Sequence, residues 1–365
     1  MTDAAFMQRA LDLARRGRGW VNPNPLVGAV VVRDGKIVGE GFHPRLGEAH
    51  AEVFALREAG EKARGATIYV TLEPCNHWGR TPPCTQAIID AGIRHVVAAT
   101  WDANPLTAEQ SRKTLEAAGV TLSVGLLEAD ARRLNEPFFH FMRTRRPFVV
   151  MKTAMTMDGK IATPSGHSQW ISGEVSREHV HELRATYAGV MVGIGTVLAD
   201  DPSLTCRLPD AHAPARIVVD PRAETPPDAK LFADPSPVLL AIAPHADPAR
   251  RRALEARGAQ LLEVPLGANG RHLDLDALMA MLGEQGLDSI LLEGGGGLNA
   301  SALRAGIVTK VVTFIAPKLL AGDGIPPTHG PAFATMDQAL PLRDLSCYPS
   351  GPDIRLEAYL DGPAG

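Results

Sequence analysis

The stretch Thr71-Leu-Glu-Pro-Cys75-Asn-His-Trp-Gly-Arg-Thr-Pro-Pro-Cys84 decides how the first half of the chain is interpreted. It begins at the end of an apolar run, 66–71, that reads as a buried strand. It ends where Pro82-Pro83 introduce a helix that starts near Cys84. A strand, a loop with one cysteine and a helix start with another form one local unit. The pattern predicts a layered α/β domain in which two thiols lie near one end of a strand.

A third metal-binding side chain stands upstream, in His50-Ala51-Glu52. One imidazole and two thiolates from Cys75 and Cys84 are three protein ligands, which leaves the fourth tetrahedral position of a zinc ion for water. Zinc lowers the pKa of such a water towards neutrality. Glu52 is close enough to the metal to take the proton of this water and pass it to a leaving amine. The pattern predicts a catalytic zinc site with Glu52 as proton shuttle.

Two less specific interpretations compete with this one. A lone His-x-Glu pair is common, and two cysteines are usually core residues. A structural zinc would need a fourth ligand, which His77 could supply, but Glu52 would then have no task. His-x-Glu followed by Pro-Cys and a later Cys is the signature of zinc-dependent base deaminases. In many of these the cysteines are two residues apart, whereas here eight residues separate Cys75 from Cys84.

The flanking sequence supports a complete domain around this site. Asp3 is a candidate N-cap for an opening helix over 3–16. Asp34-Gly35 between two apolar runs predicts a β-hairpin. We further expect helices at 49–59, 84–92 and 107–118, and strands at 95–100 and 120–124.

The polar stretch Arg143-Thr-Arg-Arg-Pro147 predicts a solvated linker between two domains, 1–145 and 146–365. The second domain repeats the alternation of strands and helices. Its expected strands are 148–154, 190–194, 217–220, 238–242, 290–293, 311–315 and 353–360, with helices such as 174–188 and 273–282.

Length, charge and cysteine content limit the class of protein. A chain of 365 residues has room for two domains, and a formal charge of −4 does not predict a broad nucleic-acid surface. No secretory signal and no membrane-spanning run is recognised. Four cysteines are too few for a disulfide scaffold, so reduced thiols and a cytoplasmic location are expected.

The chain resembles the bifunctional deaminase–reductase family of riboflavin biosynthesis. In the first half the matching blocks are Asn22-Pro-Asn-Pro-Leu-Val-Gly28, Gly39-Glu-Gly-Phe-His43, Gly47-Glu-Ala-His-Ala-Glu52 and the stretch Thr71 to Cys84. In the second half they are Lys152 to Ala162, Ser168-Gln-Trp-Ile-Ser172, Gly195 to Thr205, Leu292-Glu-Gly-Gly295 and Ile315-Ala-Pro-Lys-Leu-Leu320. The resemblance covers nearly the whole chain, and the blocks stand in the family's order.

The resemblance implies a cytidine-deaminase-like α/β/α domain followed by a dihydrofolate-reductase-like α/β domain. It implies hydrolytic deamination of 2,5-diamino-6-(5-phosphoribosylamino)-4-pyrimidinone at one Zn²⁺, then reduction of the ribosyl group to ribityl with NADPH. The partner would be this small pyrimidine ribosyl phosphate, with no nucleic acid and no membrane. The family is usually a homodimer or homotetramer. The alternative is a zinc deaminase of another amino-pyrimidine or nucleic acid base with an appended non-reductase binding domain.

The resemblance also implies the residues of both sites. For the deaminase these are the metal ligands His50, Cys75 and Cys84, catalytic Glu52, and the substrate residues Asn24, His43, His77 and Arg80. For the reductase, substrate positions are Lys152, Ser168, Arg184, Leu204, Arg207 and Glu293. Cofactor positions are Ala154, Trp170, Thr196, Asp200, Gly295, Gly296, Gly297, Leu298, Asn299, Ala300 and Ser301. From the sequence alone, Asn24 could equally be a turn residue of Asn-Pro-Asn-Pro.

The glycine run Glu293-Gly-Gly-Gly-Gly297 ends an expected strand and opens an expected helix, which exposes backbone N–H groups to a phosphate. It is not a Gly-x-Gly-x-x-Gly motif, because position 299 is asparagine. Asp200 or Lys152 could assist a proton transfer, although charged residues near a turn more often only cap structure. One segment departs from the family pattern. After Asp102-Ala-Asn-Pro105 the chain reads Leu106-Thr-Ala-Glu-Gln-Ser-Arg112, which leaves the metal ligands intact but bears on substrate fit.

Overall fold

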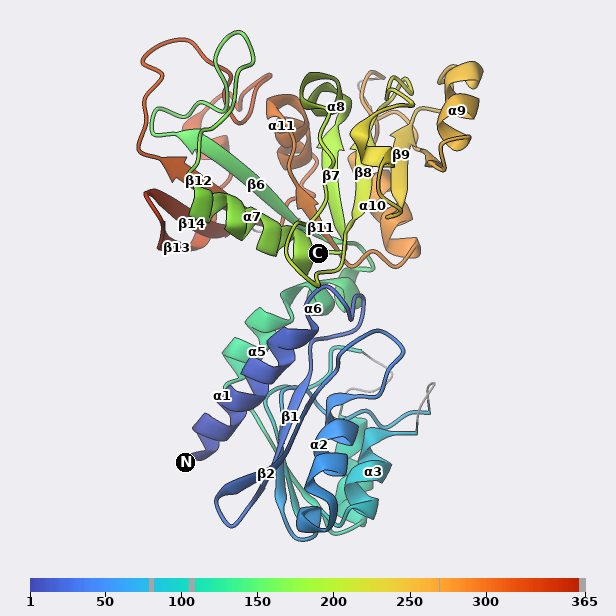
Figure 1. Cartoon of the computed structure of the whole chain (residues 1–365), viewed down its shortest axis with the longest axis vertical. Coiled ribbons are helices and arrows are strands. Elements are labelled where there is room, and N and C mark those ends of the chain that lie inside the picture. Colours follow the sequence, from blue (N-terminus) through green and yellow to red (C-terminus); the bar gives the residue numbers. More distant parts are fainter. Residues whose placement is uncertain (79–81, 105–108, 269, 361–365) are drawn as a thin grey trace. The chain divides into compact units, whose positions relative to one another are not determined.

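The computed structural model describes residues 1–78, 82–104, 109–268 and 270–360. The chain divides into two compact units, Met1–Thr144 and Arg145–Gly365. Each unit contains its own sheet, with helices packed on it (Figure 1). Each unit also has its own buried apolar clusters, so each forms a separate hydrophobic core.

The first unit is built on a sheet with the strand order β2-β1-β3-β4-β5. Its strands are β1 (Gly28–Arg33), β2 (Lys36–Phe42), β3 (Thr67–Val70), β4 (His95–Ala98) and β5 (Thr121–Val124). The expected hairpin at Asp34-Gly35 is confirmed, because β1 and β2 pair in antiparallel register and both turn residues have positive φ. β3, β4 and β5 are parallel, so the loops that follow β3 and β4 lie at one edge of the sheet.

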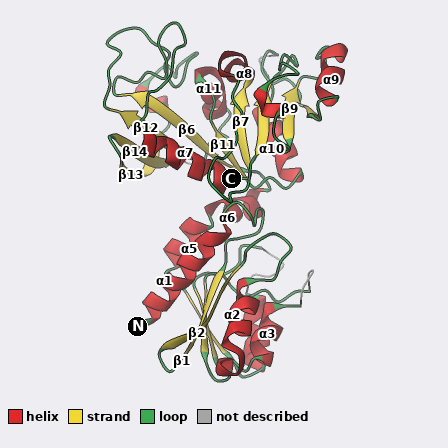
Figure 2. Cartoon of the chain, viewed as in Figure 1, coloured by secondary structure: helices red, strands yellow, loops and turns green. Residues whose placement is uncertain are grey.

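Helices cover both faces of this sheet (Figure 2). They are α1 (Asp3–Ala14), α2 (Ala51–Ala59), α3 (Cys84–Asp90), α4 (Gln110–Ala117), α5 (Glu128–Leu134) and α6 (Glu136–Thr144). Residues of α2, α3 and α4 pack in one cluster with Val31, Ile68 and Val96. Residues of α1 and α5 pack on the other face with Val30 and Tyr69. The unit is therefore a three-layer α/β/α sandwich.

One sequence expectation for this unit is wrong, and the expected linker at its end holds only in part. The N-cap of α1 is Thr2, whose hydroxyl accepts the Ala5 N–H, so the helix begins with Asp3 inside its first turn. The stretch expected as a solvated linker is partly helical, since α6 continues to Thr144. Arg146, in the same stretch, is paired with the Asp276 carboxylate instead of lying free in solvent.

The second unit is built on a nine-stranded sheet with the order β10-β9-β8-β7-β11-β6-β12-β14-β13. The strands are β6 (Phe148–Thr156), β7 (Gly189–Gly193), β8 (Ala215–Val219), β9 (Val238–Ile242), β10 (Gln260–Glu263), β11 (Ser289–Leu292), β12 (Lys310–Ala316), β13 (Leu342–Ser350) and β14 (Asp353–Leu360). All neighbours from β10 to β12 are parallel, and β14 pairs antiparallel with both β12 and β13.

The helices of the second unit are α7 (Glu174–Thr186), α8 (Ile194–Asp200), α9 (Pro248–Glu255), α10 (Leu275–Glu284) and α11 (Gly296–Arg304). Apolar residues of α7, α8 and α9 pack in one cluster, and those of α10 and α11 pack in a second. β11 lies between β6 and β7, with Leu292 opposite Met151. This register brings Glu293, directly after β11, beside Lys152 of β6.

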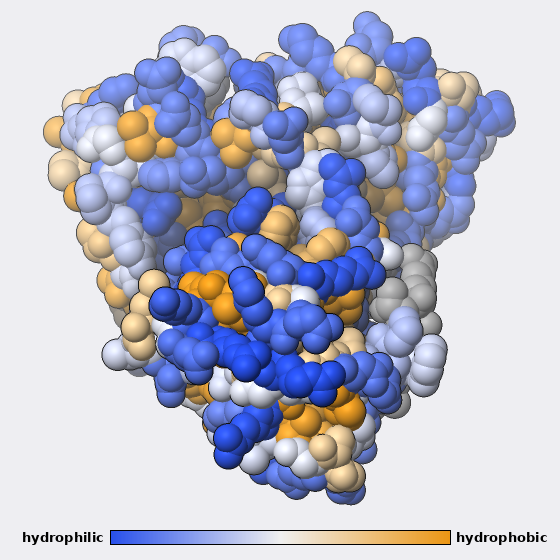
Figure 3. Space-filling view, turned by 60° about the horizontal axis from the view of Figure 1, so that its bottom comes forward, coloured by the Kyte–Doolittle hydropathy of each residue, from blue (hydrophilic) through white to orange (hydrophobic). Residues whose placement is uncertain are grey.

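None of the helices in the described part of the chain is long and apolar enough to cross a membrane. The face seen in Figure 3 is mostly hydrophilic, with hydrophobic side chains in separate small groups.

Candidate active sites

The first unit brings together the three expected metal ligands. The ligand atoms of His50, Cys75 and Cys84 all lie within 4.8 Å of one another. His50 Nδ1 is 3.2 Å from the Cys84 sulfur and 3.5 Å from the Cys75 sulfur. Of the residues described, only these three form such a cluster, and the exposed His77 is not part of it. The donor set is therefore two sulfurs and one nitrogen, without a fourth protein ligand.

Two helix N-termini position this cluster. His50 is the N-cap of α2, and Cys84 is the first residue of α3. The Cys84 backbone N–H donates to the Cys75 sulfur at 3.3 Å. Hydrogen bonding from Cys84 and His50, against the effect of burial, lowers the pKa of Cys75 to about 4. A thiolate held this way is a ready ligand for a soft cation.

Glu52 faces the cluster from the first turn of α2. Its side chain is 3% exposed, and its Oε2 atom makes no hydrogen bond with any described residue. Burial raises the pKa of Glu52, although the nearby His50 lowers it. A buried carboxyl oxygen without a partner is costly unless a ligand or water completes its hydrogen bonding. Glu52 therefore has the environment of an acid–base group.

A cavity of about 400 Å³ opens beside the cluster. Among its lining residues are His50, Glu52 and Cys75 and three of the expected substrate residues, Asn24, His43 and His77. Asn24 belongs to a turn, because its N–H donates to Val21 O, and its side-chain amide lies 3.3 Å from His43 Nε2, while its role in substrate binding stays a prediction. Arg80, the fourth expected substrate residue, lies outside the described residues.

The ring of His43 is held in one orientation by two contacts. Nδ1 is 3.1 Å from Ala49 O, and Nε2 is 3.3 Å from Asn24 Nδ2. A carbonyl oxygen accepts only, so Nδ1 carries the proton and Nε2 accepts from the Asn24 amide. Burial lowers the pKa of His43, which favours this neutral form. Asn24 thereby keeps its amide oxygen available to the cavity.

Glu73, for which the sequence suggested no role, also lines the cavity. Its buried carboxylate accepts four hydrogen bonds, from the N–H groups of Asp102, Glu109 and Ser111 and from the Ser111 hydroxyl, at 2.6–3.2 Å. The chain before and after residues 105–108 is thus tied to one residue. Residues 105–108 themselves lie outside the described part of the chain. The sequence feature that could have indicated a role for Glu73 is its position two residues before the candidate ligand Cys75.

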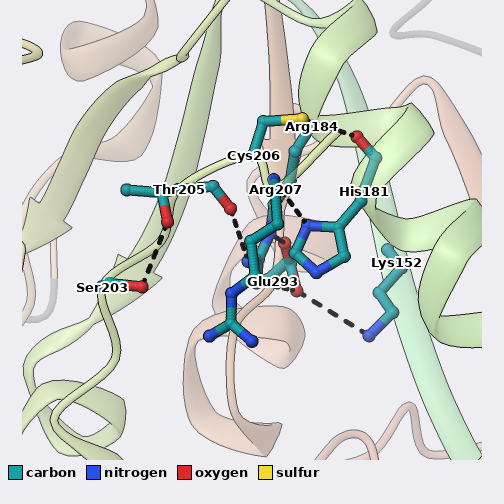
Figure 4. A network of polar contacts seen from close by, with 8 residues as sticks. All are labelled: Lys152, His181, Arg184, Ser203, Thr205, Cys206, Arg207 and Glu293. Carbon is teal, nitrogen blue, oxygen red and sulfur yellow. Dashed lines mark hydrogen bonds and ion pairs between the residues drawn. The ribbon is translucent and has the colours of Figure 1, made fainter. Parts of the chain in front are cut away.

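The second unit has a compact polar network at the end of β11 (Figure 4). Arg184 of α7 holds Glu293 through Nε and Nη2, at 2.6 and 3.1 Å. Lys152 Nζ lies 3.7 Å from Glu293 Oε2. Burial would raise the pKa of Glu293, but the charges of Arg184 and Lys152 outweigh it and lower this pKa to about 2. The network therefore holds one carboxylate between two cations.

A turn from 203 to 207 joins this network. Arg184 Nη1 donates to Thr205 O at 3.1 Å. Leu204, an expected substrate residue, has a buried side chain in the core and a positive φ of 54°. Only its backbone could face a ligand. The side chain of Arg207 is exposed. No ion pair of its guanidinium is found within residues 1–78, 82–104, 109–268 and 270–360.

The expected cofactor residues fall into four places. Ala154 is on β6, and Thr196 and Asp200 are on α8. Trp170 lies on the loop between β6 and α7, as does the expected substrate residue Ser168, and the Arg177 guanidinium is 4.7 Å from the Trp170 ring centre. The residues Gly295 to Ser301 form the N-cap and first turns of α11. Of these, Ala300 is buried, and the side chain of Leu298 packs partly against the core.

The start of α11 is shaped by its glycines. An ideal Cβ on Gly295 would meet only Thr196 Oγ1, at 3.8 Å, whereas one on Gly296 would lie 2.7 Å from the ring of His329. Asn299 donates to Pro327 O, but its buried Oδ1 has no partner among the described residues. The helix start thus combines open space at its N-cap with an unsatisfied acceptor.

Comparison with known proteins identifies both halves. Residues 1–100 match the family model of the cytidine and deoxycytidylate deaminase zinc-binding region, and residues 147–356 match that of the RibD C-terminal domain. The riboflavin biosynthesis protein RibD of Actinobacillus pleuropneumoniae is 45% identical, over 100% of this chain and 96% of its own length. The chain belongs to the RibD family. Like RibD, it is a bifunctional enzyme of riboflavin biosynthesis with a deaminase and a reductase domain.

Other RibD proteins extend the similarity. RibD of Escherichia coli K12 is 43% identical, over 88% of this chain and 90% of its own length. The structure of Acinetobacter baumannii RibD, form 1, matches with a TM-score of 0.88 at 38% identity, covering 98% of this chain and 99% of that one. A Thermotoga maritima diaminohydroxyphosphoribosylaminopyrimidine deaminase/5-amino-6-(5-phosphoribosylamino)uracil reductase matches at 0.84 and 35%, covering 98% of both chains. The expected cytidine-deaminase-like and dihydrofolate-reductase-like folds are confirmed.

Sequence reasoning missed one further residue in the reductase half of this RibD-family chain. His181 of α7 accepts the Arg207 N–H at Nδ1, at 3.3 Å, and its carbonyl oxygen accepts from the Cys206 thiol at 3.4 Å. His181 stands three residues before Arg184 on a helix that was expected, so both side chains share one helix face. That spacing was the signal that could have found it.

Proposed function

We propose that the first unit deaminates 2,5-diamino-6-(5-phosphoribosylamino)-4-pyrimidinone and that the second reduces the ribosyl group of the product with NADPH. The observation that carries the first half is the cluster of His50, Cys75 and Cys84 with the unpartnered Glu52 Oε2, all at one cavity. The two activities for which the Thermotoga maritima relative is named support the choice of substrates.

The residues present fit a single zinc ion. Two thiolates and one imidazole are ligands that zinc prefers, and a set of three is typical of catalytic sites. When bound, zinc supplies a positive charge that lowers the pKa of a water ligand and stabilises negative charge in the transition state. His50, Cys75 and Cys84 would hold it.

Glu52 moves the protons of the deamination. Its Oε2 takes a proton from the attacking water while the water oxygen bonds to the ring carbon that bears the amino group. The same oxygen returns a proton to the amine nitrogen, the C–N bond breaks, and ammonia leaves. Burial of Glu52 supports this role, because it raises the pKa of the carboxyl above its ordinary value and excludes bulk water.

Polar residues of the cavity would orient the substrate. The free amide oxygen of Asn24 can accept from a ring N–H, because the amide nitrogen is engaged by His43. His77, an exposed residue that lines the cavity, would hold the ribosyl phosphate together with Arg80. His43 would then act chiefly by fixing Asn24.

The start of α11 fits the phosphates of a dinucleotide. Gly295 is its N-cap, and open space beside that residue lets an anion approach the free backbone N–H groups. The unpartnered Oδ1 of Asn299 could accept a hydroxyl hydrogen from the cofactor. NADPH supplies the hydride when bound. Gly295 to Ser301, with Thr196 and Asp200, would hold it.

The polar network would hold the ribosyl phosphate against the cofactor. Arg184 fixes Glu293, and Glu293 can accept hydrogen bonds from sugar hydroxyls. Reduction of the sugar carbon opens the ring, so a proton must reach the ring oxygen. Lys152 is the better placed of the two candidates, because burial lowers its pKa, whereas Asp200 is exposed at the end of α8.

Product analysis tests the proposal. The zinc-loaded chain is incubated with the diamino-pyrimidinone ribosyl phosphate, with and without NADPH, and the products are identified by mass. We expect replacement of one amino group by oxygen without NADPH, and a further gain of two hydrogens with it. Deamination alone would contradict the reductase half, and no change would mean a different amino-pyrimidine substrate. Parallel assays with NADH establish the cofactor preference, and light scattering tests the expected homo-oligomer.

A further inference from the structure

The turn from 203 to 207 is held by one face of α7. Arg184 Nη1 donates to Thr205 O, the Cys206 thiol donates to His181 O, and the Arg207 N–H donates to His181 Nδ1. Three consecutive residues of the turn are therefore bound to two residues of the helix. Leu204 anchors the other side of the turn, because its side chain is buried in the core.

The contact at Arg207 assigns the state of the histidine ring. Nδ1 can accept the Arg207 N–H only if it carries no proton, so the ring is neutral with its hydrogen on Nε2. Burial, together with the positive charges of Arg184, Arg207 and Lys152, lowers the pKa of His181, while Glu293 raises it. These neighbours keep the ring in its accepting form. Figure 4 shows Nδ1 facing the Arg207 backbone.

The position of Arg207 gives this contact a function. Its backbone is fixed by His181, whereas its guanidinium is exposed and has no ion pair among the described residues. An exposed guanidinium without such a pair is suited to a phosphate. An anchored backbone limits the conformations through which a long side chain must search before it binds.

We propose that His181 is a positioning residue of the reductase site, which fixes the turn through Nδ1 so that Arg207 meets the phosphate of the ribosyl substrate. The inference rests on the proposed reductase function. His181 touches neither the hydride donor nor the reacting carbon in this role. It changes the affinity for the phosphorylated substrate and leaves the chemical step alone.

Three substitutions distinguish the role of Nδ1 of His181 from that of Nε2. His181→Asn keeps an acceptor near the place of Nδ1, His181→Gln carries its amide out to the place of Nε2, and His181→Ala removes both. One neutral hydrogen bond corresponds to about five- to tenfold in affinity. We expect His181→Gln and His181→Ala to raise KM for the deaminated ribosyl phosphate by about this factor, with kcat and the NADPH Kd within about twofold. His181→Asn should restore KM.

Two controls exclude a merely structural effect. With a substrate that lacks the phosphate, His181→Gln should leave KM unchanged. In an Arg207→Ala background, His181→Gln should add little to the KM already raised by the loss of the guanidinium. In the unaltered enzyme KM should also rise as the pH falls and Nδ1 takes up a proton. His181→Asn should lack that part of the profile, while the titration of the substrate phosphate remains in both.

Several results would overturn the inference. An equal rise in KM with and without the phosphate would show that the turn does not act through Arg207. A rise in KM for His181→Asn as large as that for His181→Ala would exclude the Nδ1 contact. A fall in kcat at constant KM would assign His181 to the chemical step. If the unaltered chain reduces no ribosyl phosphate with NADPH, the proposed function fails instead.

Discussion

Arg184 holds both carboxylate oxygens of Glu293, with Nε and Nη2 at 2.6 and 3.1 Å, and so keeps a negative charge in a buried site. Lys152 adds a second positive charge 3.7 Å away. Removal of the carboxylate leaves two cations close together without compensation. A buried pair is costly to break in this way, even where its presence adds little net stability.

Glu293→Gln should therefore destabilise the second unit at neutral pH, and the difference should narrow in acid. The pKa of Glu293 in the folded chain is about 2, below the ordinary 4.5, so its ionised form stabilises the fold above pH 4.5 and this contribution is lost as the pH falls from 4.5 towards 2. The difference between these two pKa values corresponds to a pH-dependent contribution of about 3 kcal/mol to the free energy of unfolding. Urea unfolding of both proteins across this range measures it. Glu263→Gln, at an exposed ion pair, is the matched control, and a constant difference for Glu293→Gln would contradict the assignment.

Glu52→Gln should abolish deamination and spare the reductase. Glutamine fits the buried space but cannot take a proton from water, and loss of such a group typically costs 10²- to 10⁴-fold. Zinc content should not change. NADPH oxidation on substrate that is already deaminated should also continue, because Glu52 belongs to the other unit. Glu61→Gln, at an exposed position, is the control, and an equal loss of both activities would refute separate sites.

Cys84→Ser should remove the metal and with it the deaminase activity. Serine is a weak zinc ligand, so metal content after dialysis should fall from about one ion per chain to near zero. Cys347→Ser changes an exposed cysteine far in sequence from the cluster and should keep both zinc and activity. Treatment with a chelator should reproduce the Cys84→Ser result without unfolding most of the chain. Cooperative unfolding of the first unit would instead mean that the zinc is structural.

Glu73→Gln should weaken the segment from Asp102 to Ser111. All four partners of this carboxylate are donors, and one side of a glutamine amide would present its own N–H groups to them. We expect a loss of about 2–4 kcal/mol in unfolding free energy and a higher deaminase KM, at unchanged zinc content. Ser111→Ala removes the hydroxyl contact and should cost about 1 kcal/mol. Equal stability of Glu73→Gln and the unaltered chain would show that the segment is held elsewhere.

Gly296→Ala should weaken NADPH binding. The added Cβ would lie 2.7 Å from His329 Cδ2 and 2.8 Å from Pro326 O, so the segment packed on the start of α11 must move. Gly322→Ala meets no atom within 4 Å and is the control for a glycine substitution in a nearby loop. Fluorescence titration with NADPH compares the two. Unaltered affinity in Gly296→Ala would place the cofactor phosphates away from this helix start.

Local signals made much of the deaminase site predictable. Pro82-Pro83 and the strand ending at Thr71 located the two cysteines, and His50 stands at a helix start as expected. The pairing of Lys152 with Glu293 could not be derived in this way. It depends on the insertion of β11 between β6 and β7, a choice made by the packing of the whole sheet.

Two strands with little buried surface, β10 and β13, were also not predicted from the sequence. β10 is an edge strand in which only Leu262 is buried, and β13 is exposed over almost its whole length. β13 lacks the alternation of apolar and polar residues that predicts a strand, because almost none of it faces the core. β10 packs Leu261 and Leu262 against the core, but its four residues are too few to show an alternation. The role of Glu73 could not be predicted for another reason, since three of its four hydrogen-bond donors are backbone N–H groups that any sequence would supply.

Each unit folds around its own apolar clusters and holds all the described residues of its own site. A substitution that inactivates one site therefore need not affect the activity of the other. Chains inactivated at Glu52 and chains inactivated at Glu293 should complement each other when mixed, provided that the deaminated intermediate can leave one molecule and enter another. In a cell that makes both inactivated variants, riboflavin synthesis should then depend on diffusion of the deaminated intermediate from one variant to the other. The growth rate without added riboflavin would measure how readily this intermediate is released.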